Sequence, residues 1–263
     1  MQTIQEIANL KPSLTERCYD DILSKRVWFY NAVIGNLTGY DCKVCKNKGN
    51  IAVIKDGAEI MQECECMNIR RSVFRIEKSG LKNLLQEYTF EKYDLTELWQ
   101  KKAKEVAQRF LNDYKSKWFY MGGQVGSGKS HLCTAIVGDF LNRGFSAKYM
   151  LWRDEIVQLK ANVNDDTAYS GYMDTLKTTK VLYIDDFFKT EKDKSPTAAD
   201  VNIAFELINY RYNNKDLITI ISSEKSIDDL IFIDEAVGSR IYQRTKDFCM
   251  HIGLDRRKNF RLK

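Results

Sequence analysis

A run of eight residues near the middle of the chain has the composition of a phosphate-binding loop. The run GQVGSGKS matches the pattern G-x-x-x-x-G-K-[ST] in full. Its glycines allow backbone N–H groups to face phosphate oxygens, and a helix that begins there adds partial positive charge. Lys129 is expected to reach the β- and γ-phosphates, and the Ser130 hydroxyl to bind Mg²⁺. The residues predicted to hold a nucleoside triphosphate are Gly123, Gln124, Val125, Gly126, Ser127, Gly128, Lys129 and Ser130.

Two adjacent carboxylates supply the acidic groups that such a loop requires. The apolar stretch VLYI at 181–184 ends in Asp185 and Asp186. Asp185 is placed to hold Mg²⁺ together with Ser130, and Asp186 to orient or deprotonate an attacking water. The alternative is a strand that merely ends in two acidic residues, and the preceding phosphate loop favours the metal role.

A third apolar stretch, LITII at 217–221, leads into Ser222, Ser223 and Glu224. A polar group at this position would lie beside the γ-phosphate and sense hydrolysis. A simple exit from a strand into a loop is the alternative. Ser223 and Glu224 are both candidates for the sensing role.

Four of the seven cysteines occur as two close pairs with the spacing C-x2-C-x18-C-x-C. Paired cysteines in a reducing compartment are more often metal ligands than disulfides. On an extended segment, Cys64 and Cys66 project to the same face, so both thiolates can meet one ion. Four thiolates form a closed tetrahedral site without room for a catalytic water, which predicts a structural zinc ion. The expected ligands are Cys42, Cys45, Cys64 and Cys66, with four reduced, metal-free cysteines as the alternative.

The elements around these residues alternate between helix and strand from about residue 94 onward. Strands without period-2 alternation, separated by helices, are typical of a parallel sheet that is covered on both faces. The fold class is therefore predicted to be α/β. Strands are expected at 118–121, 147–151, 181–184, 217–221 and 248–252. Helices are expected at 154–161, 198–213 and 234–244, after one capped by Asp94 and Glu97 and one that begins at Lys129.

The N-terminal part of the chain has a different character. Residues 1–40 are expected to be helical, with Ser13 and Glu16 as a capping box. The Asp56-Gly57 pair between strand-like runs predicts a hairpin. Trp28, Phe29 and Tyr30 face either the core or a partner. We expect an N-terminal region at 1–66 with a zinc module at 41–66, a basic connector at 67–93 and a larger domain at 94–263.

Composition excludes several classes of protein. The 263 residues carry 41 Lys and Arg against 36 Asp and Glu, with 14 Gly and only 2 Pro, which argues against collagen-like and disordered chains. No apolar run is long enough to span a membrane, and the first residues lack the features of a signal peptide. We therefore expect a cytoplasmic protein. The basic segments Arg70 to Lys82 and Arg240 to Lys263 are candidate contacts for single-stranded DNA, or are solvated surface.

Taken in order, four segments of the chain resemble AAA+ ATPases. They are GQVGSGKSHLCTAI, VLYIDDFFK, FELINYRYNNKDLITIISSE and DEAVGSRIYQR. Within that superfamily they resemble the bacterial and phage helicase loaders of the DnaC/DnaI type, over about residues 88–263. The stretch YTFEKY at 88–93 is similar to the segment that leads into the ATPase domain of that family. The resemblance implies a five-stranded parallel sheet in the order 5-1-4-3-2, flanked by helices and preceded by a small helical and zinc-ribbon domain.

The resemblance also implies roles for residues beyond the phosphate loop. Arg240 matches the arginine finger that would reach the γ-phosphate of a neighbouring subunit, with a surface arginine as the alternative. Arg261 resembles the second sensor arginine, which would touch phosphates of its own subunit, and Arg256 and Arg257 compete for that role. His131 follows the phosphate loop and is counted with the nucleotide-binding residues, although a structural role is the simpler interpretation. The predicted catalytic set is Lys129, Asp185, Asp186 and Arg240.

The function that the resemblance implies is ATP-dependent loading of the hexameric replicative DNA helicase onto single-stranded DNA. The N-terminal region would bind the helicase, and ATP with Mg²⁺ would act at subunit boundaries of a self-associated oligomer. One departure is Glu224, which stands where many relatives carry Asn. The alternatives are an IstB-type transposition helper, which acts with a transposase on duplex DNA, and a non-hydrolysing adaptor that ATP switches. The intact Lys129, Ser130, Asp185 and Arg240 favour an active ATPase.

Overall fold

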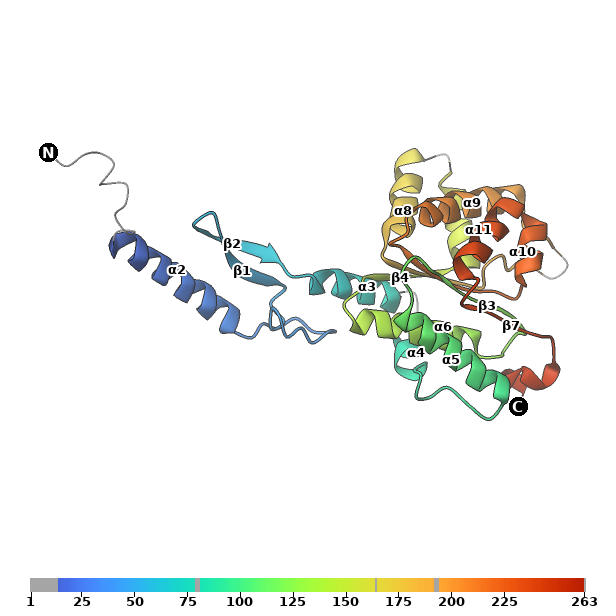
Figure 1. Ribbon diagram of the computed structural model, residues 1–263. Helices are drawn as coiled ribbons and strands as arrows, with labels where there is room; N and C mark the ends of the chain where they lie inside the picture. The colour runs from blue at the N-terminus through green and yellow to red at the C-terminus, as the bar shows by residue number, and fades with distance from the viewer. Residues whose placement is uncertain (1–13, 79–80, 164, 192–193, 263) are drawn as a thin grey trace, which may run out of the picture. The chain divides into compact units, whose positions relative to one another are not determined.

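The computed structural model describes residues 14–78, 81–163, 165–191 and 194–262 of the chain. The chain divides into two compact units, Met1–Arg70 and Arg71–Lys263 (Figure 1). The predicted capping box of Ser13 and Glu16 lies outside the residues whose side chains are described. Among the described residues, no helix is both long enough and apolar enough to cross a membrane.

The first unit contains a helix, a hairpin and the loops that carry the cysteines. Helix α2 (Leu14–Ala32) precedes strands β1 (Asn50–Lys55) and β2 (Ala58–Glu63), which pair antiparallel. Asp56 and Gly57 join the two strands with φ angles of 52° and 74°. A two-residue hairpin turn with both residues in the left-handed region matches the twist of the flanking strands. The predicted hairpin is therefore confirmed.

Helix α2 ends at Ala32, whereas the sequence predicted helix to about residue 40. Two lysines from the cysteine-bearing loop bind the carbonyl groups at this end. Lys46 Nζ lies 3.1 Å from Ala32 O, and Lys48 Nζ lies 2.8 Å from the carbonyl oxygen of the next residue. Cations in this position satisfy carbonyls that a helix terminus leaves free. Asn31 fixes the helix to the hairpin, because its side-chain amide exchanges two hydrogen bonds with the backbone of Ala52.

The second unit is built on a five-stranded sheet. Its strands are β3 (Phe119–Gly123), β4 (Ala147–Leu151), β5 (Val181–Asp185), β6 (Ile218–Ser222) and β7 (Cys249–Ile252). They lie in the order β4-β5-β6-β3-β7, and all neighbouring pairs run parallel. Counted within this unit and from the β7 edge, that order is 5-1-4-3-2, so the sheet implied by the resemblance is confirmed. Every residue of β3, β5 and β6 is buried, as in a parallel sheet covered on both faces.

Helices cover the two faces of this sheet (Figure 1). One face carries α4 (Leu81–Glu87), α5 (Leu98–Asn112) and α6 (Lys129–Asn142). The other carries α8 (Asp166–Thr178), α9 (Ala198–Asn213), α10 (Ile227–Ile233) and α11 (Glu235–Thr245), and α7 (Trp152–Ala161) contacts α8 and α9. Helix α3 (Cys66–Lys78) follows β2, and two short 3-10 helices, η1 (Arg256–Lys258) and η2 (Phe260–Leu262), follow β7.

Four of the α-helices, α3, α4, α8 and α10, were not predicted from the sequence. Helix α8 is rich in polar residues and buries only Met173 and Leu176, so its apolar periodicity is weak. Helix α10 has seven residues, which is too short for a clear period. The predicted connector also contains helix α4, which packs on α6 within the second unit.

The topology places the carboxyl ends of β5, β6 and β3 side by side at one edge of the sheet. Parallel strands all end at the same edge, and ligands of such sheets bind in the crevice beyond it. The phosphate loop follows β3, Asp185 ends β5 and Ser222 ends β6. The predicted site residues from three separate segments therefore meet at this edge.

Candidate functional site

The phosphate loop joins β3 to α6 as its sequence predicts. Gly123, Gly126 and Gly128 have φ angles of 101°, 70° and 84°, a region that residues with a side chain adopt only with strain. Lys129 Nζ donates hydrogen bonds to the carbonyl oxygens of Gly123 at 2.9 Å and Gln124 at 2.8 Å. Burial lowers the pKa of Lys129, because a charged ammonium is costly where little water reaches it. A phosphate bound in this loop would meet a cation that water solvates poorly.

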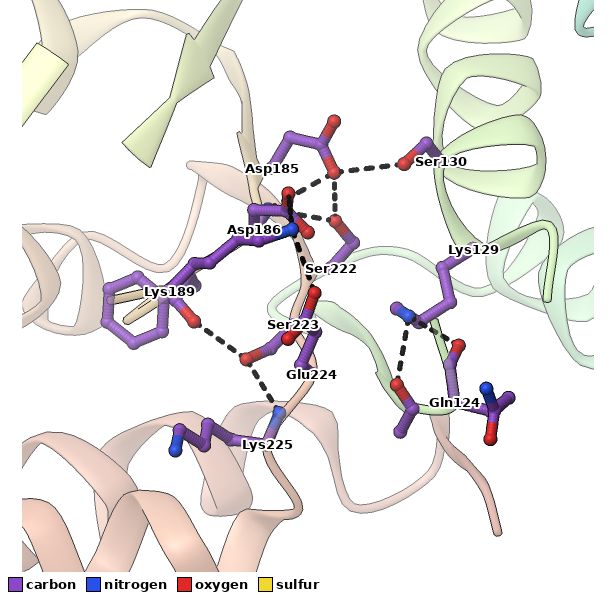
Figure 2. Close-up of polar contacts among 12 residues, drawn as sticks. Gln124, Lys129, Ser130, Asp185, Asp186, Lys189, Ser222, Ser223, Glu224 and Lys225 are labelled. Atoms are coloured by element: carbon purple, nitrogen blue, oxygen red, sulfur yellow. Dashed lines mark hydrogen bonds and ion pairs between the residues drawn. The ribbon is translucent and has the colours of Figure 1, made fainter. Parts of the chain in front are cut away.

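Asp185 accepts hydrogen bonds from three hydroxyl groups at the end of β5. The donors are Ser130 at 3.1 Å, Tyr149 at 3.1 Å, and Ser222. Figure 2 shows the contacts with Ser130 and Ser222. Ser130 and Asp185 are the two predicted Mg²⁺ ligands, and the structure brings their side chains together. A hydroxyl and a carboxylate are oxygen ligands of the kind that Mg²⁺ prefers. These two residues therefore fit the ion that a nucleoside triphosphate carries.

Asp186 makes an ion pair that the sequence did not predict. Its Oδ2 atom lies 2.9 Å from Lys189 Nζ, and the same ammonium lies 2.8 Å from Oε1 of Glu224. Lys189 thus bridges two acidic side chains that follow neighbouring strands. A lysine three residues beyond Asp186 has no distinctive spacing, so the sequence offered no signal for this contact.

The two candidate sensors, Ser223 and Glu224, differ in their surroundings. The Ser223 hydroxyl is buried, donates to Phe187 O at 2.7 Å and accepts from the Lys225 N–H at 3.1 Å (Figure 2). The Glu224 side chain instead lines the same pocket as the phosphate loop. The structure therefore brings Glu224, rather than Ser223, to this pocket.

The pocket has a volume of about 360 Å³ and contains aromatic rings in addition to these charged groups. The rings of Tyr88 and His131 stack with centroids 4.6 Å apart, and Tyr93 meets His131 edge-on at 5.2 Å. Burial lowers the pKa of His131, whose Nε2 lies 2.8 Å from Thr89 O and donates to it as a neutral ring. Flat aromatic surfaces are suited to a nucleobase. The sequence singled out residues 88–93 for their resemblance to the family but not as pocket residues.

The segment after β7 packs directly on the phosphate loop. The Phe260 N–H donates to Gly126 O at 2.9 Å. The Asn259 side chain lies so close to Gly126 that a Cβ added there would be 1.9 Å from Asn259 Oδ1. Gly126 is therefore required for this contact as well as for its positive φ angle. The segment and the loop are therefore fixed to each other.

Three arginines of this segment compete for the role of second sensor. Arg261 lines the pocket. Arg257 instead forms an ion pair with Asp255 at 2.9 Å, and Arg256 lines a separate groove. Arg261 is thus the one of the three that the structure brings to the pocket.

Arg240 lies on α11, outside the pocket of its own chain. Its Nε donates to Asn209 Oδ1 at 3.1 Å and its Nη1 to Ala236 O at 2.8 Å. The guanidinium also lies 5.3 Å from the ring of Phe205 and 5.6 Å from that of Tyr212. Arg240 is therefore held in one orientation by α9 and α11. The structure therefore does not bring Arg240 to the nucleotide pocket of its own chain.

The four paired cysteines come together in the first unit. Their Sγ atoms all lie within 4.8 Å of one another, with Cys42 and Cys64 at 3.8 Å and Cys45 and Cys66 at 3.5 Å. All four are buried, and the cysteines whose side chains are described form no disulfide. Sulfur atoms bound tetrahedrally at about 2.3 Å from one ion would lie about 3.8 Å apart. The cluster therefore fits a zinc ion in ligand type, number and spacing.

Arg70, which the sequence offered as a nucleic-acid contact, is engaged inside the first unit. Its guanidinium donates to Thr38 O, to Tyr40 O at 2.7 Å and to Asn47 Oδ1 at 2.8 Å. Asn47 Oδ1 also accepts from the backbone N–H of Cys42 at 2.9 Å. Arg70 thus supports the loop that carries the cysteines. Three other basic residues of that segment, Arg75, Lys78 and Lys82, have side chains outside those described.

The sheet order, the phosphate loop and the acidic strand end define an AAA+ P-loop nucleotide-binding domain. The family model for IstB-like ATP-binding proteins matches residues 58–263, which is more than half of the chain. The chain therefore belongs to the IstB-like ATP-binding protein family.

Several known proteins are similar to this chain. Phage-like element PBSX protein XkdC of Bacillus subtilis strain 168 is 30% identical over 224 residues, which are 81% of this chain and 82% of that protein. Replicative helicase loader DnaC of Escherichia coli K12 is 27% identical over 132 residues, which are 49% of this chain and 53% of DnaC. The match thus spans about half of the length of DnaC. The crystal structure of DnaI aligns with a TM-score of 0.54 and 23% identity, over 66% of this chain and 94% of that chain. The recognition of a DnaC/DnaI-type AAA+ domain is confirmed.

Proposed function

We propose that this protein loads the hexameric replicative DNA helicase onto single-stranded DNA, and that ATP hydrolysis drives release of the helicase. The observation that carries the proposal is the combination of three features in one chain. They are a phosphate site with its Mg²⁺ ligands paired, an ordered Arg240 outside that site, and a cysteine cluster ahead of the ATP-binding domain. The similarity to helicase loader DnaC supports it.

In this proposal the parts of the chain have separate tasks. Residues 1–66 bind the helicase and include the zinc module at 41–66, residues 67–93 connect, and residues 94–263 form the ATPase domain. Exposed aromatic side chains support the binding task. Trp28 and Phe29, near the end of α2, are 65% and 64% exposed. Large exposed apolar groups are a feature of protein interaction sites.

The site residues divide the hydrolysis reaction among them. Lys129 neutralises charge on the β- and γ-phosphates, and Ser130 with Asp185 holds Mg²⁺. Asp186 orients the attacking water or accepts its proton. Arg240 of one subunit stabilises the charge that develops on the γ-phosphate held by the next. Hydrolysis therefore requires the self-associated oligomer, and this requirement couples turnover to assembly.

Light scattering on a size-exclusion column tests whether this protein associates with the replicative helicase. The protein is mixed with the replicative helicase hexamer of its host, with ATP and Mg²⁺ present. A single species heavier than the hexamer is expected, and its mass gives the stoichiometry. Two separate peaks, in a sample that binds ATP, would contradict the proposal.

A transposition helper of the IstB type is the second candidate function, because the matching family model is that of IstB-like ATP-binding proteins. Such a helper acts with a transposase on duplex DNA rather than with a helicase. ATP-dependent binding to long duplex DNA, without a complex with the helicase, would favour this function.

Zinc is expected to stabilise the first unit alone. Replacing Cys45 and Cys64 together with alanine removes one ligand from each sulfur pair, so the loop between α2 and the hairpin loses its support. Elemental analysis should give about one zinc ion per wild-type chain and almost none in the variant. Hydrogen exchange should become fast in residues 35–66 while amides of the central sheet stay protected. Two results would contradict the assignment. One is a variant that contains as much zinc as the wild type. The other is a wild-type protein, stripped of its metal, in which the amides of both units stay equally protected from hydrogen exchange. Cys249→Ser, outside the cluster, is the matched control.

A further inference from the structure

The turn that follows Asp185 is held in an unusual backbone conformation. Asp186 and Phe188 have φ angles of 54° and 55°, which cost free energy for residues with a side chain. Phe187 lies between them, and its N–H donates to Ser222 O at 2.9 Å. Its carbonyl accepts from the Ser223 hydroxyl at 2.7 Å. The end of β6 thus fixes the turn from both sides.

Aromatic packing in the core also stabilises this turn. The rings of Phe187 and Phe188 are fully buried and stack with centroids 4.3 Å apart. Both meet the ring of Trp152, at 4.7 Å and 5.4 Å. Backbone strain persists only where the surroundings determine it, and it gathers at functional sites. The consequence of this turn is that the chain folds back and brings Lys189 over Asp186.

Lys189 is the cation between two carboxylates at the triphosphate end of the pocket. Its ammonium lies 2.9 Å from Asp186 and 2.8 Å from Glu224, and all three side chains line the pocket. Burial alone would lower the pKa of Lys189, but the hydrogen bonds that its ammonium donates to Glu224 and Asp186 raise the pKa above its ordinary value. Lys189 therefore stays charged at neutral pH.

Without a cationic partner, the Glu224 carboxylate would disfavour binding of a triphosphate in this pocket. It follows β6, which lies between β5 and β3 in the sheet, so it stands between the Mg²⁺ ligand and the phosphate loop. A carboxylate there repels the γ-phosphate, and two like charges at such distances interact strongly when water is partly excluded. An ammonium that contacts the carboxylate directly removes most of that repulsion.

We propose that Lys189 is a positioning residue that makes the pocket accept a nucleoside triphosphate, by pairing with Glu224 and Asp186 at the γ-phosphate end. The inference rests on the proposed role of the phosphate loop and assigns a specificity to that same site. Because Lys189 acts where the γ-phosphate lies, it affects ATP and leaves ADP nearly untouched. Lys189 and Glu224 work as a pair, so loss of one is compensated by neutralising the other.

Nucleotide affinities of charge variants test this inference. Calorimetry with a non-hydrolysable ATP analogue and with ADP is carried out on the full chain. Lys189→Met should weaken binding of the ATP analogue about 10- to 100-fold and change ADP binding by less than about threefold. Lys189→Arg should retain the wild-type ratio of the two affinities. The double variant Lys189→Met with Glu224→Gln should recover most of the lost affinity for the ATP analogue. Lys194→Met, a lysine of the same loop that pairs with Glu191, is the control and should behave as wild type.

Two results would overturn the inference. One is an equal loss of ATP-analogue and ADP affinity in Lys189→Met, which a merely structural role would produce. The other is a double variant that binds the ATP analogue no better than Lys189→Met. Failure of the helicase complex in light scattering would refute the proposed function and leave these affinities unaffected, so the two proposals fail separately.

Discussion

Replacing Lys129 with alanine is expected to abolish binding of ATP. The ammonium is held by the carbonyl oxygens of Gly123 and Gln124 inside the phosphate loop. A phosphate must replace those carbonyls as its partner, and alanine supplies no charge for that exchange. Loss of a charge-assisted contact to two phosphates should weaken binding at least about 100-fold. Isothermal titration calorimetry with ATP measures the effect.

Two comparisons make the result on Lys129 specific. Lys101→Ala, at an exposed position of α5, should bind ATP as wild type does. The thermal unfolding midpoint of Lys129→Ala should stay close to that of wild type, since removing a buried ammonium relieves a desolvation cost. Binding within tenfold of wild type would show that the nucleotide lies elsewhere.

Replacing Arg240 with alanine is expected to leave ATP binding intact and to abolish turnover. Arg240 is held by Asn209 and by the Ala236 carbonyl on α9 and α11, away from the pocket of its own chain. An arginine that stabilises the transition state from a neighbouring subunit contributes about 10³-fold or more to kcat. Steady-state phosphate release at protein concentrations that allow self-association measures the loss, with calorimetry as the test of binding.

Mixing two inactive variants separates a neighbour's arginine from one that acts in its own chain. Lys129→Ala keeps Arg240 but holds no ATP, and Arg240→Ala holds ATP but lacks the finger. In an equimolar mixture, about one quarter of the subunit boundaries pair an intact site with an intact Arg240. Activity should therefore reappear on mixing. A mixture as inactive as its components, or full turnover in Arg240→Ala alone, would contradict the boundary assignment.

The sequence predicted the central sheet and the phosphate loop closely, because both rest on strong local signals. Fully buried parallel strands read as continuous apolar runs, and the helix at 198–213 agrees with α9 (Ala198–Asn213). The pattern G-x-x-x-x-G-K-[ST] predicted the loop between a strand and a helix, and its three glycines have positive φ angles in the structure. The Asp56-Gly57 pair likewise fixed a turn type that few residues allow.

Features that depend on tertiary contacts could not be predicted from local patterns in the sequence. The ion pairs of Lys189 depend on a turn whose strain is maintained by Trp152 and by the end of β6, and no local pattern encodes that combination. The end of α2 at Ala32 depends on Lys46 and Lys48 from a distant loop. Tyr88 and Tyr93 belong to a stretch that resembles the family, but their spacing in the sequence did not indicate that their rings line a pocket.

Helicase retention on closed circular single-stranded DNA tests the central claim most directly. A ring-shaped hexamer cannot thread onto a circle that has no ends, so stable binding requires that the ring be opened or assembled around the strand. The helicase is incubated with the circle and ATP, with and without this protein, and helicase that resists a high-salt wash is quantified. The account predicts retention that depends on the wild-type protein and is lost with Lys129→Ala. Equal retention with and without the protein would contradict it.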